Sequence, residues 1–123
     1  MPHDSVIALL DWLKERHAAV MACEQQALHA LYEANDKKSH ETLMRRKAEL
    51  LAALDSDAAH LIAALPDDIR QTVQSGLKGF ADSARNGLRL DSVFYYSALL
   101  YPDEHKAGEP DNLALFITQL ESM

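Results

Sequence analysis

Apolar residues recur at steps of three and four along most of this 123-residue chain, and this repeat constrains the fold more than any other feature. It runs first from Val6 to Leu31, then from Leu43 to Leu65, and then from Ile69 to Leu99. Steps of three and four place side chains along one side of an α-helix, whereas a strand needs steps of two. The repeat therefore predicts three long amphipathic helices.

The breaks between these helices follow from polar residues and proline. The polar segment 35–39 predicts a tight connection between the first two helices. Pro66 ends the second helix, because the residue before a proline is pushed out of the helical region. The third helix is expected over 67–101 with a kink at Asn86–Gly87, and two shorter helices over the same range are the alternative.

The C-terminal part of the chain predicts a linker followed by a short amphipathic helix. Residues 102–110 are polar and contain Gly108 and Pro110, as linkers do. Residues 111–123 form the helix. A helix of about ten residues is not stable alone in water, so it docks either on its own bundle or on a partner, and the sequence leaves both alternatives open. Its candidate partner-binding face consists of Leu113, Phe116, Ile117 and Leu120.

Together these segments predict an all-α fold in a single domain. Only four glycines and four prolines are present, which is little material for the turns of an all-β chain. We expect an antiparallel bundle of three long helices, resembling a coiled-coil hairpin, plus a short C-terminal helix. The bundle comprises residues 1–101, the linker 102–110 and the C-terminal helix 111–123.

Charge and cysteine content limit the partners and the compartment. The chain has 12 basic and 19 acidic residues, a net charge of −7, which disfavours nucleic acid because such binding depends on neutralising phosphates. A single cysteine, Cys23, cannot form an internal disulfide, which fits a reducing compartment. No apolar run approaches the roughly 20 residues needed to cross a membrane. We therefore expect a cytoplasmic protein that does not insert into membranes.

Residues that could support catalysis or bind a metal do not form a recognisable motif. His29 and Glu33 are four residues apart, and Asp57 and His60 are three apart, so each pair can share a helix face. A metal site needs three or four converging ligands, and no second pair supports either one. His60 also lacks the neighbouring cation and small residue of a phosphotransfer site. We expect no catalytic residue, no metal and no cofactor.

Aromatic residues near the end of the third helix raise the question of surplus apolar surface. Tyr95 follows the core phase of the predicted helix, while Phe94, Tyr96 and Tyr101 point elsewhere. Trp and Tyr are enriched at the centres of protein interfaces. Long amphipathic hairpins with such surplus surface often self-associate, so a homo-oligomer is one expectation that these residues raise.

Two stretches resemble the FlgN family of flagellar export chaperones, over roughly residues 4–101. Segment 83–90 resembles the family's Asn-x-x-Asn-Gly motif through Asn86 and Gly87, although Ser83 stands where the family usually has its first Asn. The order after Gly87 also differs from the commoner arrangement. The other stretch resembles the family's acidic turn and its Leu/Lys/Leu-Leu pattern, in Glu33-Ala34-Asn35-Asp36 followed by Leu43, Lys47, Leu50, Leu51 and Leu54.

The resemblance implies a cytoplasmic chaperone for the flagellar type III export system. Such a protein binds unassembled hook-filament junction proteins, keeps them soluble and brings them to the export apparatus. In that family the C-terminal region carries much of the substrate binding, which here corresponds to the predicted helix over 111–123. The alternative is a general helical adaptor, another secretion chaperone or a scaffold subunit with a different partner.

Overall fold

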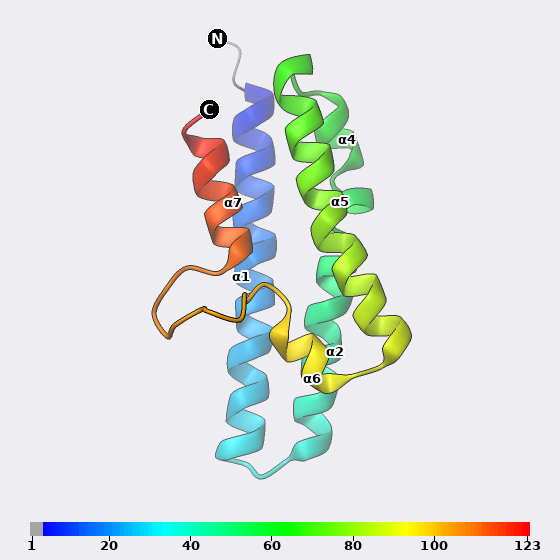
Figure 1. Cartoon of the computed structure of the whole chain (residues 1–123), viewed down its shortest axis with the longest axis vertical. Coiled ribbons are helices and arrows are strands. Elements are labelled where there is room, and N and C mark those ends of the chain that lie inside the picture. The colour runs from blue at the N-terminus through cyan, green and yellow to red at the C-terminus, as the bar shows by residue number, and fades with distance from the viewer. Residues whose placement is uncertain (1–3) are drawn as a thin grey trace.

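A computed structural model describes residues 4–123 of the chain, and this range contains seven α-helices and no strand (Figure 1). The prediction of an all-α chain is therefore confirmed. The range contains no helix long and apolar enough to span a membrane. The helices are α1 (Asp4–Tyr32), α2 (Lys37–Ala52), α3 (Leu54–Asp57), α4 (Ala59–Ala63), α5 (Asp67–Leu90), α6 (Val93–Ala98) and α7 (Asn112–Glu121).

The core lies between α1, α2 and α5, with α7 added beside α1 (Figure 1). The α1 helix packs against both α2 and α7, and α2 packs against α5. Leu13 of α1, Leu51 of α2 and Leu77 of α5 are each at most 1% exposed. The apolar repeat read from the sequence thus supplies one shared core, since each stripe faces the neighbouring helices.

The connection between α1 and α2 is the predicted tight turn. Asn35 adopts the left-handed conformation (φ 51°) after the end of α1. Asp36 caps α2, because its Oδ1 accepts from the Ser39 N–H at 3.0 Å and its Oδ2 accepts from the Ser39 hydroxyl at 2.6 Å. Capping satisfies N–H groups that have no partner inside the helix, which explains why the helix restarts at Lys37.

The second predicted helix is interrupted, and the expectation of one continuous helix up to Pro66 was wrong. Breaks at Ala53 and Ala58 divide it into α2, α3 and α4. Near the first break, the Ser56 hydroxyl donates to the Ala53 carbonyl at 3.4 Å, and the Ser56 N–H donates to Asp55 at 2.8 Å. Local side-chain bonds of this kind compete with the helical ladder. Nevertheless Leu54, Ala58 and Ile62 remain buried.

The third predicted helix also divides, as the alternative reading of 67–101 allowed. The break lies at Asp91, which is left-handed (φ 50°), and not at the expected kink Asn86–Gly87. Ser92 then caps α6 by accepting from the Tyr95 N–H at 3.2 Å. The break resets the helical phase, so Tyr96 is buried while Phe94 is 83% exposed. The prediction that Tyr96 lies outside the core was therefore wrong.

Gly87 allows α5 to pack closely against α6. It is buried and lies in the last turn of α5, where its lack of a side chain leaves room for a neighbour. A Cβ atom at this position would lie 2.7 Å from Cδ1 of Tyr95, much closer than van der Waals contact. At Gly79, in the middle of the same helix, a Cβ atom would meet nothing within 4 Å.

We therefore expect Gly87→Ala and Gly79→Ala to change stability in opposite directions. Gly87→Ala forces the Tyr95 ring aside and should lower the free energy of unfolding by about 1–3 kcal/mol. Gly79→Ala, the matched control, should raise it by roughly 0.5–1 kcal/mol, since alanine has the better helix propensity. Urea unfolding followed by circular dichroism measures both. Equal effects would show that Tyr95 does not require the space at Gly87.

Candidate functional site

The predicted partner-binding face on α7 is docked on the chain's own bundle. Leu113, Ile117 and Leu120 are 0%, 6% and 4% exposed and belong to the main core cluster. The helix packs mainly along α1 (Figure 1). Of the two alternatives for the C-terminal segment, the structure therefore contains the one in which the helix folds back. Any partner that uses these three side chains has to meet α7 after it has left α1.

Phe116, the fourth predicted residue, extends from α7 to α5. Its ring meets Phe80 edge to face, with 5.7 Å between the ring centroids and 72° between the planes. The same ring lies directly over Gly76, where a Cβ atom would collide with it. Gly76 thus makes room for Phe116, and this contact fixes how deeply α7 sits. Leu115, by contrast, is 52% exposed and lies outside the docked face.

Two ion pairs join α7 to α1. At the start of α7, Oδ2 of Asp111 lies 2.8 Å from Nε2 of His17, while Oδ1 accepts from the Ala114 N–H at 2.9 Å. At its end, Glu121 pairs with Lys14 at 2.8 Å, and both side chains are exposed. Exposed pairs contribute little to stability, so the buried Asp111 carboxylate is the more important contact.

His17 and Asp111 shift each other's pKa. The hydrogen bond that His17 makes to the Asp111 carboxylate raises the pKa of His17 above its ordinary value, although burial opposes the shift. Burial alone would raise the pKa of Asp111, but His17 and the backbone N–H of Ala114 hold that pKa below its ordinary value. Both shifts favour an ion pair between imidazolium and carboxylate.

A buried lysine lies beside this pair. Lys47 of α2 is fully buried, and its Nζ forms an ion pair with Oε2 of Glu24 at 2.8 Å. The geometry of this contact is not that of a hydrogen bond, so Oε2 of Glu24 accepts none. The Lys47 Nζ donates to the Ser97 carbonyl at 3.3 Å and lies over the Tyr101 ring, 5.0 Å from the centroid. Burial lowers the pKa of Lys47, and Glu24 counteracts part of that shift.

Lys47, Glu24, the Ser97 carbonyl and Tyr101 form what we call the lysine cluster, and Tyr101 connects it to the C-terminal segment. Its hydroxyl donates to Oε1 of Glu24 at 2.5 Å, and burial together with this carboxylate raises its pKa far above the ordinary value. The connection beyond it closes on itself, since the Asn112 N–H donates to the Leu100 carbonyl at 2.9 Å. The predicted linker therefore begins and ends at one place, and α7 starts beside the lysine cluster.

Sequence reasoning missed this polar cluster, although one signal was present. Lys47 stands four residues after Leu43 and four before Leu51, at a position of α2 that the helical repeat assigns to the core. A charged residue in the apolar phase is rarely buried unless it is paired. The pattern could have indicated a buried lysine, but not Glu24 or Tyr101 as its partners.

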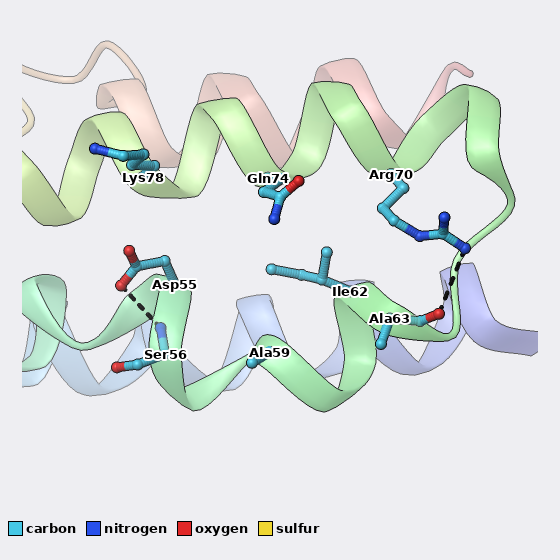
Figure 2. Close-up of a pocket in the computed structure, with 8 residues that line it drawn as sticks. All are labelled: Asp55, Ser56, Ala59, Ile62, Ala63, Arg70, Gln74 and Lys78. Carbon is cyan, nitrogen blue, oxygen red and sulfur yellow. Dashed lines mark hydrogen bonds between the residues drawn. The ribbon is translucent and has the colours of Figure 1, made fainter.

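A cleft lies elsewhere, between α5 and the α3–α4 segment (Figure 2). It has a volume of about 580 Å³. Arg70 and Lys78 border it, but both are paired within α5, with Asp67 and Asp82 at 2.6 Å each. Figure 2 shows Arg70, Gln74 and Lys78 on one helix, across the cleft from the α3–α4 segment. The lining residues are Asp55, Ser56, Ala59, Ile62, Ala63, Arg70, Gln74 and Lys78.

The remaining sequence candidates occupy separate places. Asn86 is exposed and accepts a hydrogen bond from Arg89. His29 and Glu33 form an exposed ion pair at 2.6 Å. Asp57 pairs with Arg16 at 2.8 Å. Among residues 4–123, no group of three or more His, Cys, Asp or Glu side chains is placed to hold a metal ion.

Comparison with known proteins does not extend these observations. The chain matches no protein-family model, no curated protein and no solved structure.

The lysine cluster leads to a prediction about stability. We expect Lys47→Met to lower the free energy of unfolding by about 2–3 kcal/mol, because the largely buried Glu24 carboxylate then loses its cation and keeps only the hydrogen bond from Tyr101. Adding Glu24→Gln should recover most of the loss, since the uncompensated charge is removed. Urea unfolding at neutral pH measures both variants. A double variant as unstable as Lys47→Met would show that the lost packing of Lys47, and not the charge, is responsible.

Proposed function

We propose that this protein is a cytoplasmic, FlgN-like export chaperone that binds an unassembled hook-filament junction protein through the apolar face of α7. It would keep that protein soluble and bring it to the flagellar export apparatus. The observation that carries the proposal is the docking of α7: a short helix with an apolar face packs mainly on one neighbour and follows a polar connection. Such a helix can leave while the remaining core stays closed.

The chemistry of α7 suits recognition of another helix. Leu113, Phe116, Ile117 and Leu120 stand at steps of three, one and three, which is the pattern with which amphipathic helices enter apolar grooves. Binding would cost the docked contacts and the ordering of the segment, which lowers affinity and allows release. Reversible binding is what a delivery chaperone requires.

The rest of the proposal concerns the scaffold and the partner. We infer that the long helical stretches act as an antiparallel, hairpin-like bundle that presents α7 without taking part in chemistry. The single cysteine, Cys23, is buried, which fits a reducing cytoplasm. The identity of the partner, including the export apparatus, comes from the resemblance at Asn86–Gly87 and around Lys47. No nucleic acid, membrane insertion or cofactor is part of the proposal.

Deleting residues 110–123 would be a poor test, because it would also uncover the part of α1 that α7 buries. Tethering α7 to α1 keeps the bundle intact. We suggest Lys14→Cys with Glu121→Cys in a Cys23→Ala background, joined by a short bifunctional maleimide. The native side chains at these two positions already touch on the surface. The matched control is the same protein capped at both thiols by a monofunctional maleimide.

We expect the tethered protein to lose affinity for a purified hook-filament junction protein by about tenfold or more, because the binding face cannot leave α1. The capped control should bind as the untreated protein does, and calorimetry measures both. Equal binding by tethered and capped protein would move the site to the bundle. If even the untreated protein does not bind, the partner class is wrong and the helical adaptor becomes the better hypothesis.

A further inference from the structure

The contact between His17 and Asp111 lies at the point where α7 begins. Asp111 is only 5% exposed, and it uses its two carboxylate oxygens for different purposes. Oδ1 caps α7 through the Ala114 N–H, and Oδ2 meets Nε2 of His17 at 2.8 Å. The same carboxylate therefore fixes the first turn of α7 and ties that turn to α1.

The charges around His17 balance only when its imidazole is protonated. Asp111 and Glu24 supply two negative charges, and the buried Lys47 supplies one positive charge. A protonated His17 makes this group neutral, whereas a neutral His17 leaves one negative charge without compensation. Uncompensated charge in a partly buried site is unfavourable.

The other titratable groups nearby already have partners of their own. On α1, Lys14 is paired with Glu121. From the connection before α7, the Tyr101 hydroxyl is bound to Glu24, and the His105 ring contacts Tyr101 and the Glu109 carbonyl. None of these groups replaces His17 as the cation beside Asp111.

We propose that His17 and Asp111 form a proton-dependent latch, which holds α7 on α1 when His17 is protonated and weakens as the pH rises through the neutral range. The latch is a property of α7 docking itself, and its effect on partner binding rests on the proposed function. It would let a modest change in pH alter how often the apolar face of α7 is released.

The direction in which pH changes the strength of the latch follows from the pKa shifts of His17 and Asp111. The pKa of His17 is raised in the docked state, so its stabilisation is complete below the ordinary value of about 6.5 and is lost as the pH rises through the raised value. The pKa of Asp111 is lowered, so its stabilisation is present above its ordinary value and is lost only as the pH falls through the lowered value. The latch is therefore strongest in mildly acidic solution.

Amide hydrogen exchange of α7 in the full chain tests the latch without any partner. After correction for intrinsic exchange, we expect the opening equilibrium of residues 114–120 to increase about threefold to tenfold between pH 6 and pH 8.5, as suits a partly buried ion pair. His17→Gln should remove this pH dependence, since its side chain does not titrate. His105→Gln, the matched control beside the same connection, should keep it.

Two results would overturn the latch: a wild-type opening equilibrium that does not change with pH, or a His17→Gln variant with the wild-type pH dependence. Protection of the α5 amides reports whether each variant is folded. Asp111→Asn is a second variant, since asparagine still caps α7 but carries no charge, and it should also remove the pH dependence. Because no partner enters this measurement, the latch and the proposed partner binding can fail independently.

Discussion

The burial of the apolar side of α1 is the constraint on which the other helices depend. The α1 helix is 29 residues long, and both α2 and α7 pack against it. Its side chains at Leu9, Leu13, Val20 and Ala27 are at most 1% exposed. Because α2 packs against both α1 and α5, these three helices form the main core. The C-terminal helix α7 packs on α1 (Figure 1). A change in the docking of α7 therefore uncovers mainly α1, together with Gly76 and Phe80 of α5, which Phe116 covers.

Polar contacts specify where this apolar packing stops. The buried Lys47 contacts Glu24, Tyr101 and the Ser97 carbonyl at the junction of α1, α2, α6 and the segment after α6. Such a cluster contributes little net stability compared with apolar side chains, since desolvation offsets much of the attraction. Its consequence is positional: the chain leaves the core at Tyr101 and returns at Asp111, so α7 starts at one defined place on α1.

The sequence was sufficient for the all-helical class and for most core positions of α1, α2 and α5, because periodicity depends on local spacing alone. The breaks at Ala53, Ala58 and Asp91 were not predictable from that spacing, since they depend on local side-chain bonds and on a left-handed residue. The sequence also left open whether α7 docks on its own bundle or on a partner, for a different reason. Phe116 fits over Gly76, forty residues earlier in the chain, and no local pattern indicates which distant residue leaves such room.

We propose that α7 is docked and yet separable from the bundle. Amide exchange at one pH over a range of low urea concentrations tests it most directly, by comparing residues 113–120 with residues 73–84 of α5. We predict that α7 opens at a lower free energy than α5 and with little dependence on urea, because little surface is exposed by local opening. If α7 opens with the same free energy and the same urea dependence as α5, the helix leaves only when the whole chain unfolds, and the claim is wrong.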